Sequence, residues 1–359
     1  MEKKTMRGLM IYGKGDYRYE TDIPIPEVGP DDILIKSEGS GVCASDVKCW
    51  HGAASYWGGD GIKPWVEAPF IPGHEFLGVV AEVGANITEY APGDRITVEQ
   101  IAPCGECRFC KNGQYWMCQP HKMFGYFTEF MGGMAEYVRI PTKHAKIHRV
   151  PKELPLDAAL LIEPFSCAKH CVDRAQITAE DIVVLSGAGT LGLGMVAYAA
   201  TLPRKKLIVL DMKDDRLAKA KEFGADLVWN PSKMDVVEEI MKLTEGYGCD
   251  IYIEATGHPS SVSQGMSMIR KLGRFVEFSV FGEPTTLDWS IIGDKKELDV
   301  LGSHLGPYCY PYVIEHMTDG LIKTGGVVTR KFDVSEWETA FDYATGKYGD
   351  IKVAIVFDK

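Results

Sequence analysis

Four cysteines in one short segment have the spacing of a metal site. Cys104, Cys107, Cys110 and Cys118 form the pattern C-x2-C-x2-C-x7-C within PCGECRFCKNGQYWMC. Four thiolates this close in sequence can surround one Zn²⁺ and leave no coordination position open, which is typical of structural zinc sites. The alternatives are reduced thiols that happen to cluster and, with less support, disulfides. The spacing favours a structural zinc site.

A second set of possible ligands is scattered along the chain. It consists of Cys43 in GVCASD, His74 and Glu75 in PGHEFLG, and Glu163 in IEPFSCAKH. A catalytic zinc needs few protein ligands and an open position for water or substrate, and a thiolate, an imidazole and a carboxylate suit it. Each residue also has a structural interpretation: Cys43 in the core, His74 hydrogen-bonded in a turn, Glu163 as a surface charge. Spacing alone does not show that they meet.

A glycine-rich segment supplies the third chemical signal. Gly187, Gly189 and Gly192 form G-x-G-x-x-G directly after the apolar run Ile182–Leu185. The first glycine permits a tight turn, the second lets the backbone approach a pyrophosphate, and the third lets helix and strand pack closely. The pyrophosphate would bind at the helix N-terminus. The expected contacts come from Gly187, Gly189, Thr190, Leu191 and Gly192.

An acidic residue after the next strand indicates which dinucleotide binds. Asp211 follows the apolar run Leu207–Leu210, about 20 residues beyond the glycines. Its carboxylate would accept hydrogen bonds from a ribose diol and repel a 2′-phosphate, so NAD is expected rather than NADP. Arg216 is a candidate contact for the adenosine half. Thr256 and Ser279 follow later strands and are expected to border the nicotinamide, because ligands bind beyond the carboxyl ends of parallel strands.

These motifs imply two kinds of positioning element. From Leu9 to about Val150, short apolar runs alternate with Gly/Pro turns, which predicts a β-rich region. From about Ala168, strands and helices alternate, which predicts a parallel, doubly wound sheet. The expected strands are 182–186, 207–210, 227–229, 251–253 and 275–280. The expected helices include one from Asp214 closed by Gly224, one at 234–244 and one at 261–271.

Size and composition limit the class of protein. A chain of 359 residues exceeds what one core usually supports, so two domains are expected. The net charge of −11 argues against nucleic acid or an anionic membrane as the main partner. The N-terminal segment has no apolar region of the signal-peptide type, and the ten cysteines are spread along the chain. We therefore expect a cytoplasmic protein.

Taken together, the motifs resemble the medium-chain, zinc-dependent alcohol dehydrogenase family over essentially the whole chain. The resemblance is carried by GVCASD, PGHEFLGVVAEVG, PGDRITV, the cysteine quartet, IEPFSCAKH, SGAGTLGLG and the LD at Asp211. It implies a GroES-like catalytic domain at 1–165 and 300–359, interrupted by a Rossmann domain at 166–299. It also implies NAD, one catalytic and one structural zinc per subunit, and a homo-oligomer, dimer or tetramer.

The resemblance assigns roles to the scattered residues. Cys43 and His74 match the family's catalytic zinc ligands, and Glu75 and Glu163 complete the site directly or through water, with the choice between the two left open. Zinc would act as a Lewis acid on a substrate hydroxyl, and Ser45 would accept the proton before hydride passes to the nicotinamide. Where many relatives place a relay histidine, this chain has Lys48, and His51 lies three residues further on.

The finer strings, among them CASDVKCWHGAASYWG and DWSIIGDKKELDVLGSHLGPYCYP, resemble dehydrogenases of four-carbon polyols. The expected reaction is oxidation of erythritol or L-threitol to erythrulose. L-Threonine, 2,3-butanediol, xylitol and sorbitol are alternative substrates, and an NAD-binding structural or sensor protein is the non-enzyme alternative. The candidates for lining the polyol cleft are Trp50, His51, Tyr56 and Trp57, with Glu163, although aromatic residues in this number more often belong to the core or to a subunit contact.

Overall fold

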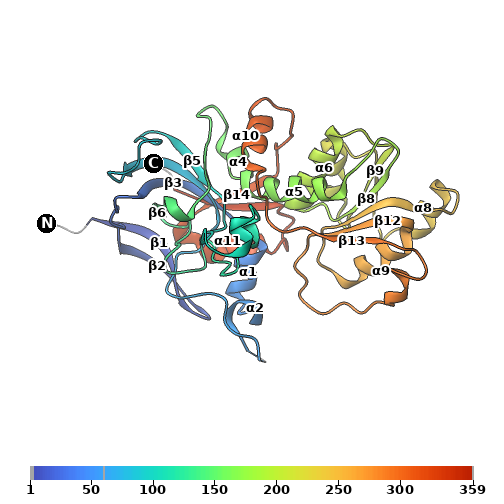
Figure 1. Cartoon of the computed structure of the whole chain (residues 1–359), viewed down its shortest axis with the longest axis horizontal. Helices are drawn as coiled ribbons and strands as arrows, with labels where there is room; N and C mark the ends of the chain where they lie inside the picture. Colours follow the sequence, from blue (N-terminus) through green and yellow to red (C-terminus); the bar gives the residue numbers. More distant parts are fainter. Residues whose placement is uncertain (1–3, 60, 358–359) are drawn as a thin grey trace. The chain divides into compact units, whose positions relative to one another are not determined.

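The computed structural model describes residues 4–59 and 61–357, and it divides into two compact units (Figure 1). Unit 1 contains the described residues up to Glu163, with Tyr310–Thr318 and the residues from Thr324 onward. Unit 2 contains Pro164–Cys309 and Asp319–Lys323. The sequence placed the second junction at 299/300. Unit 2 continues past it because β13 (Asp299–Gly302) pairs in parallel with the preceding strand of its sheet.

Unit 1 is built on antiparallel strands. Its strands are β1 (Thr5–Gly13), β2 (Asp16–Pro24), β3 (Asp32–Val42), β4 (Glu75–Val83), β5 (Arg95–Val98), β6 (Tyr137–Pro141), β7 (Ile147–Arg149), β14 (Val328–Asp333) and β15 (Lys352–Val356). β1 and β2 form a hairpin. The others form a seven-stranded sheet in the order β14-β15-β3-β4-β5-β7, with β6 also paired to β3. The β-rich domain expected from the sequence is therefore present.

Short helices complete unit 1. They are α1 (Ala44–Trp50), α2 (Ala54–Trp57), α3 (Arg108–Lys111), α4 (Leu156–Ala159), α10 (Tyr310–Thr318) and α11 (Trp337–Ala344), with 3₁₀ turns at Tyr115–Met117, Thr142–His144 and Val334–Glu336. One core cluster joins residues far apart in sequence, since Leu9, Ile71 and Met134 pack with Phe341 and Ile355. The C-terminal segment therefore belongs to the same core as the first strands.

Unit 2 is a doubly wound parallel sheet. Its strands are β8 (Ile182–Ser186), β9 (Lys206–Leu210), β10 (Leu227–Trp229), β11 (Cys249–Glu254), β12 (Ile269–Glu277) and β13. All the pairs are parallel, in the order β10-β9-β8-β11-β12-β13. This is the strand order 3-2-1-4-5-6 of dinucleotide-binding folds, with its switch point beside β8. The parallel sheet predicted from the alternating pattern is confirmed.

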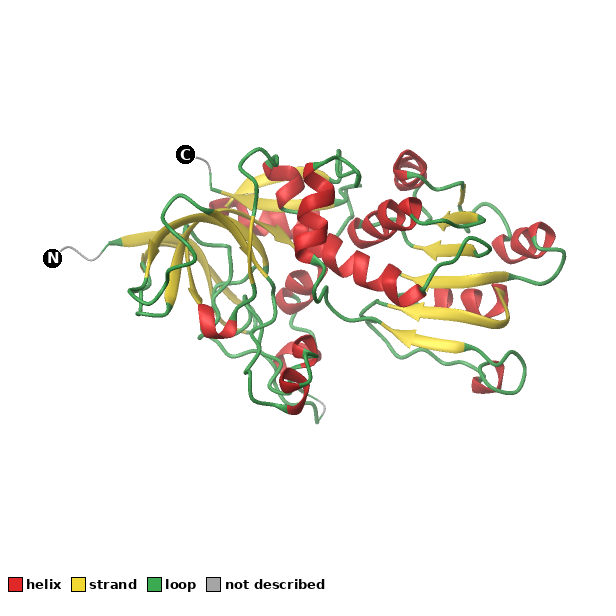
Figure 2. Cartoon of the chain, turned by 45° about the horizontal axis from the view of Figure 1, so that its top comes forward, coloured by secondary structure: helices red, strands yellow, loops and turns green. Residues whose placement is uncertain are grey.

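Helices cover both faces of this sheet (Figure 2). They are α5 (Ile162–Ala175), which begins in unit 1, α6 (Thr190–Thr201), α7 (Asp214–Phe223), α8 (Val236–Leu243) and α9 (Pro259–Met268), with a 3₁₀ turn at Trp289–Ile291. Residues of α8 and α9 pack on Val184 and Tyr252, whereas Gly192 of α6 faces Leu185 on the other side. Because both faces are covered, all five residues of β8 are buried, and the strand reads as a continuous apolar run.

Two helix ends show how local sequence sets the boundaries. Gly224 ends α7 in the left-handed conformation, with φ of 115°, as the sequence predicts. The helix predicted at 261–271 is wrong in its last residues, because α9 ends at Met268 and β12 begins at Ile269. The ammonium group of Lys296 donates to the carbonyls of Met266 and Ile269, each at 2.6 Å, and so satisfies carbonyls at this junction.

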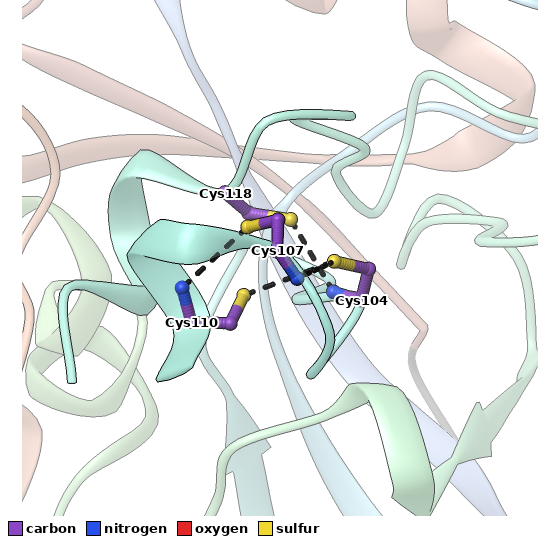
Figure 3. A group of neighbouring side chains, drawn as sticks. All are labelled: Cys104, Cys107, Cys110 and Cys118. Atoms are coloured by element: carbon purple, nitrogen blue, oxygen red, sulfur yellow. Dashed lines mark hydrogen bonds between the residues drawn. The ribbon is translucent and has the colours of Figure 1, made fainter. Parts of the chain in front are cut away.

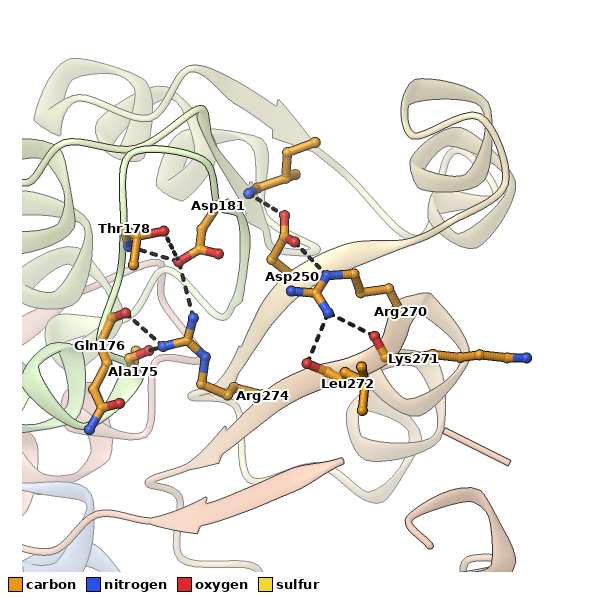
Figure 4. A network of polar contacts seen from close by, with 10 residues as sticks. Ala175, Gln176, Thr178, Asp181, Asp250, Arg270, Lys271, Leu272 and Arg274 are labelled. Atoms are coloured by element: carbon orange, nitrogen blue, oxygen red, sulfur yellow. Dashed lines mark hydrogen bonds and ion pairs between the residues drawn. The ribbon is translucent and has the colours of Figure 1, made fainter. Parts of the chain in front are cut away.

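A polar network holds the starts of the parallel strands (Figure 4). Asp250 accepts the backbone N–H of Ile182 at 2.7 Å and the Nε–H of Arg270 at 2.5 Å. Arg274 donates to the carbonyls of Ala175 and Gln176 and to Asp181. These bonds hold together the N-terminal ends of the strands, opposite to the ends that carry the glycine turn. Among the described residues, no helix combines the length and apolar composition needed to cross a membrane.

Candidate active site

The glycine turn of unit 2 has the shape that a dinucleotide requires. Gly187 has φ of 105°, and a Cβ there would lie 2.7 Å from the carbonyl oxygen of Ala255. A Cβ on Gly192 would overlap the carbonyl oxygen of Gly187, so this position must also be glycine. The atom nearest to a Cβ on Gly189 would be Nη1 of Arg216, at 3.8 Å, and α6 begins directly after this glycine at Thr190 and Leu191. An anion can therefore reach the helix N-terminus.

Asp211 lies beside this turn at the end of β9. Its Oδ2 accepts the N–H of Ala188 at 2.8 Å, and its Oδ1 accepts the N–H of Lys213 at 2.8 Å. Each carboxylate oxygen can accept further bonds, because it has more than one lone pair. The structure thus orients Asp211 through two backbone donors and leaves it able to bind a ribose hydroxyl.

The ends of β11 and β12 carry an acidic pair that the sequence analysis missed, of which Glu254 is buried and Glu277 is half-buried. Glu254 is fully buried and accepts the N–H groups of Thr256 and Gly257 as well as the Thr256 hydroxyl. Glu277 is its register partner on β12. Burial, reinforced by the charge of Glu254, raises the pKa of Glu277 to about 7. Ser279 donates to the backbone oxygen of Glu254 at 3.4 Å, so both expected nicotinamide neighbours are held by this residue.

The cysteine quartet converges as the sequence predicts (Figure 3). The four sulfur atoms lie within 4.8 Å of one another, and the Cys104 and Cys110 sulfurs are 4.0 Å apart. A tetrahedral Zn–S₄ site with bonds of about 2.3 Å has sulfur–sulfur edges of roughly 3.8 Å. The described cysteines are all free of disulfides. The four side chains therefore fit one closed zinc site.

Backbone donors favour the thiolate form within the quartet. The N–H groups of Gln119 and Cys110 donate to the Cys107 sulfur at 3.4 and 3.5 Å, and these bonds lower the pKa of Cys107 to about 6. The Cys104 sulfur accepts the N–H of Cys107 at 3.3 Å. A thiolate is the form that binds zinc, so these backbone donors favour the form of Cys107 that a zinc site requires.

The second set of ligands meets at one end of the large sheet of unit 1. The ligand atoms of Cys43, His74 and Glu75 lie within 4.8 Å of one another. Cys43 precedes α1, whereas His74 and Glu75 lie where the chain enters β4, and pairing of β4 with β3 sets Glu75 opposite Gly41. His74 and Glu75 are buried and Cys43 is partly exposed. A soft thiolate, an imidazole and a carboxylate are a donor set that suits zinc.

Two further charged side chains support this cluster. Asp46 accepts the N–H of Cys43 at 2.9 Å, and its Oδ1 lies 3.6 Å from Nδ1 of His74. That distance is within ion-pair range but too long for a hydrogen bond, so Nδ1 of the buried His74 has no hydrogen-bond partner among the described residues. Burial alone lowers the pKa of His74, but Asp46 and Cys43 outweigh it and the net pKa is raised. With Nδ1 beside Asp46, Nε2 is the nitrogen available to a metal.

Lys352 of β15 lies behind Glu75. Its ammonium group forms an ion pair with Glu75 Oε2 and donates to the carbonyl of Val42 at 3.1 Å, and both side chains are almost fully buried. Burial lowers the pKa of Lys352, but Glu75 and Cys43 outweigh that effect and raise it. A Cβ on Gly41 would overlap Glu75 Oε2 and lie 2.7 Å from Cε of Lys352. Only glycine at position 41 leaves room for this pair.

Glu163 is not part of the three-residue cluster. It is buried at the start of α5, and its Oε1 accepts a hydrogen bond from the side-chain amide of Gln100. The Gln100 oxygen in turn accepts the hydroxyl of Tyr310 at 3.0 Å. Its charge contributes to the raised pKa of Lys352, behind Glu75 and Cys43. The structure therefore places Glu75, rather than Glu163, within reach of both Cys43 and His74.

Ser45 is positioned by a tyrosine. Its Oγ accepts the hydroxyl of Tyr126 at 2.8 Å, and Tyr126 is buried. Lys48 is half-buried on the same helix, and burial lowers its pKa. His51 is exposed at the end of α1 and stacks on Trp50 with ring centroids 4.7 Å apart. The structure thus gives Ser45 a buried hydroxyl partner, whereas His51 lies outside the three-residue cluster.

The aromatic candidates for a polyol cleft separate into two groups. Trp50 packs on the core residues Trp337 and Phe341, and Trp57 donates its indole N–H to the carbonyl of Cys49 at 2.8 Å. Their main contacts are structural. Tyr56 is buried and stacks on Tyr126, with ring centroids 5.7 Å apart. Tyr56 therefore lies beside the tyrosine that donates to Ser45.

Sequence reasoning missed Asp46, Tyr126 and Lys352. Asp46 stands three residues after Cys43, at the position where an acidic side chain caps a helix start, so that signal was available. Lys352 is a single charge at the start of the apolar strand KVAIV, where burial would require a partner. Nothing in the local sequence marks Tyr126.

Two segments of the chain match known protein families. Residues 29–152 match the alcohol dehydrogenase GroES-like domain, and residues 190–319 match the zinc-binding dehydrogenase domain. The erythritol/L-threitol dehydrogenase of Mycolicibacterium smegmatis is 45% identical over 354 residues, covering 98% of this chain and 97% of the relative. The L-threonine 3-dehydrogenase of Pyrococcus horikoshii is 33% identical over 344 residues, covering 94% and 95%.

A solved structure agrees with these matches. A zinc-binding dehydrogenase from Sinorhizobium meliloti bound to NADP has a TM-score of 0.88 at 29% identity, covering 99% of this chain and 100% of that chain. The likeness therefore extends over both units, each with the fold expected for it. The chain belongs to the zinc-dependent, medium-chain alcohol dehydrogenase family.

Proposed function

We propose that this dehydrogenase oxidises a secondary hydroxyl of a short polyol with NAD⁺, with erythritol and L-threitol as first substrates and erythrulose as product. The observation that carries the proposal is the meeting of Cys43, His74 and Glu75 within 4.8 Å. The choice of a four-carbon polyol is supported by the relative of 45% identity, whose name states that activity.

Each metal site has its own set of residues. Cys43, His74 and Glu75 would hold the catalytic zinc, with Glu163 as an alternative carboxylate, and the four quartet cysteines would hold the structural zinc. When bound, catalytic zinc would supply a Lewis acid that lowers the pKa of the substrate hydroxyl. Buried Asp46 holds the backbone of Cys43 and lies beside His74, so it orients two of the three ligands.

Ser45 receives the proton that leaves the substrate hydroxyl. Lys48 does not replace the missing histidine as an obligatory base, because a lysine near neutral pH is normally charged and this one is only half-buried. Ser45→Ala should lower kcat about 10²-fold or more, and Lys48→Ala much less. A Lys48→Ala enzyme as impaired as the serine variant would show that the proton passes through the lysine.

The proposed cofactor is NAD, held by the glycine turn and Asp211. Asp211 supports this choice because its carboxylate stands at the end of β9, where it can accept a ribose diol and would repel a 2′-phosphate. The expectation of a cytoplasmic homo-oligomer is part of the proposal. The free cysteines suit a reducing compartment, and β13 offers an exposed sheet edge to a second copy. Light scattering in solution measures the subunit number.

The substrate is tested by one panel under fixed conditions. The comparison is kcat/KM with NAD⁺ for erythritol, L-threitol, D-threitol, xylitol, sorbitol, 2,3-butanediol and L-threonine. A pocket wall distinguishes one methylene by only about 1–3 kcal/mol, so larger polyols are expected to turn over more slowly rather than not at all. Should threonine or butanediol exceed both tetritols, the four-carbon assignment fails. No turnover in any member, with zinc loaded, would favour a structural or sensor role.

A further inference from the structure

The phenol of Tyr56 interacts with the Ser45 hydroxyl, and the phenol of Tyr126 donates a hydrogen bond to it. The two oxygens are 2.8 Å apart, which is the usual length of an O–H···O bond, whereas Tyr126 Oη lies 3.4 Å from Asp46 Oδ1. One phenolic proton can serve only one strong acceptor at a time. The distances assign it to Ser45 and leave Asp46 to its backbone donor at Cys43 and its contact with His74.

The ring of Tyr126 cannot move away from this position. It is 2% exposed and lies among four other rings: Trp65 at 5.0 Å, His74 at 5.5 Å, Tyr56 at 5.7 Å and Phe70 at 6.2 Å between centroids. Its backbone carbonyl accepts the N–H of Glu67 at 3.0 Å. Both ends of the residue are therefore held, and the hydroxyl is presented to Ser45 in one place.

The backbone before Tyr126 is adapted to bring the ring close to the ligand segment. Gly125 has φ of 84°, and a Cβ there would lie 3.0 Å from the nitrogen of Gly73, which precedes His74. The N–H of Gly125 donates to the carbonyl of Phe130 at 2.8 Å. The loop that carries the tyrosine therefore packs directly on the loop that carries His74.

A serine hydroxyl has one proton and two lone pairs, and it rotates freely unless a partner fixes it. When Tyr126 donates to one lone pair, the remaining lone pair and the proton of Ser45 have defined directions. Because the hydroxyl is already oriented to receive a proton, the reaction has a smaller entropic cost for orienting it.

We propose that Tyr126 is a positioning residue for the reaction, and that it acts by fixing the hydroxyl of Ser45 with its phenol. The inference rests on the proposed function, because it requires Ser45 to receive the substrate's proton. Tyr126 acts through Ser45, and the prediction is therefore about the coupling of the two residues.

A double-mutant cycle measures that coupling. Tyr126→Phe keeps the ring and its packing and removes the hydroxyl. It should lower kcat roughly 3- to 10-fold, as expected for one lost hydrogen bond, with the KM for NAD⁺ unchanged. In a Ser45→Ala background the same change should lower kcat less than about 2-fold. In a Ser45→Thr background, which keeps a hydroxyl, Tyr126→Phe should again lower kcat by the full factor.

The matched control is Tyr115→Phe. Tyr115 is also a buried tyrosine of unit 1, and its hydroxyl donates to Glu99 at 2.8 Å. The control should cost thermal stability but leave kcat unchanged. Zinc content and the thermal midpoint, measured for every variant, report whether each one is folded and loaded.

Two outcomes overturn the proposal, and they can be told apart. If Tyr126→Phe lowers kcat by the same factor with serine and with alanine at position 45, the tyrosine acts by packing, and the proposed function stands without this inference. If Ser45→Ala leaves kcat intact, Ser45 does not receive the proton, and the function proposed for that residue fails together with the inference.

Discussion

Removing Lys352 should strongly destabilise unit 1, because the lysine is the buried counter-charge of Glu75. The side chains of Lys352 and Glu75 are 4% and 1% exposed. In metal-free Lys352→Met the carboxylate must stay charged in a dry site or take up a proton, and both cost free energy. Breaking one partner of a buried ion pair typically costs about 3–5 kcal/mol.

The packing around the pair supports the upper part of that range. The position where a Cβ of residue 41 would stand overlaps Glu75 Oε2, so there is little room for water to replace the ammonium group. Unit 1 has about 200 residues, and for domains of that size about 2–4 °C of melting temperature corresponds to 1 kcal/mol. For about 4–5 kcal/mol, the upper part of the range, the expected loss is roughly 8–20 °C.

The measurement is urea and thermal unfolding followed by tryptophan fluorescence, with zinc content determined for each variant because bound metal adds to stability. Lys331→Met is the matched control, since Lys331 pairs with Asp157 at 2.7 Å but both side chains are about half exposed. It should cost less than about 1 kcal/mol. Glu75→Gln combined with Lys352→Met should recover most of the stability. A loss below about 1 kcal/mol for metal-free Lys352→Met, compared with the metal-free parent, would refute the reasoning.

Three other predictions follow from features described above. Cys107→Ser should remove about one zinc per subunit and lower the melting temperature with little change in substrate KM, as metal analysis and calorimetry can show; loss of only the catalytic zinc would contradict it. Asp211→Ser should weaken NAD⁺ and relatively favour NADP⁺, so an unchanged ratio of kcat/KM for the two cofactors would exclude the role given to Asp211. The raised pKa of Glu277, near 7 in the fold against an ordinary value of 4.5, means that the folded state binds more protons than the unfolded state between these pH values. The contribution of this group to the free energy of unfolding therefore falls as pH rises from about 4.5 to 7. Glu277→Gln should flatten the pH dependence of the unfolding free energy in this range, as measured by urea titrations. If the variant keeps the pH dependence of the parent, Glu277 is not the cause of it.

Features set by short-range sequence could be predicted. The cysteine quartet and the glycine turn each lie within about 15 residues, and both have the expected shape. The end of α7 is likewise set locally, by the left-handed conformation of Gly224. In contrast, the helix predicted up to residue 271 is too long because strand pairing ends it. The local pattern is compatible with a helix there, but β12 pairs with β11 from Ile269 onward.

The side chains that hold the candidate catalytic residues in place could not be predicted, because they come from positions far away in the sequence. Tyr126 and Ser45 are 81 positions apart, and Lys352 and Val42 are 310 positions apart. A sequence motif identifies ligands such as Cys43 and His74 by their neighbours. It carries no signal for a residue whose only contribution is a hydroxyl or a charge delivered from another strand.

The place of β15 in unit 1 has a consequence for how the chain folds during synthesis. β15 pairs with β14 and with β3, and its residues Val353 and Ile355 pack in the same core as Leu9. Until residues 328–356 have left the ribosome, β3 has β4 beside residues 39–41 but lacks β15 on its other side, next to residues 39–42 that lead to Cys43. Unit 2 is almost contiguous in sequence and can fold earlier. Residues translated first must therefore wait for residues translated last, and chaperone dependence should be greatest for nascent chains stalled between 310 and 350.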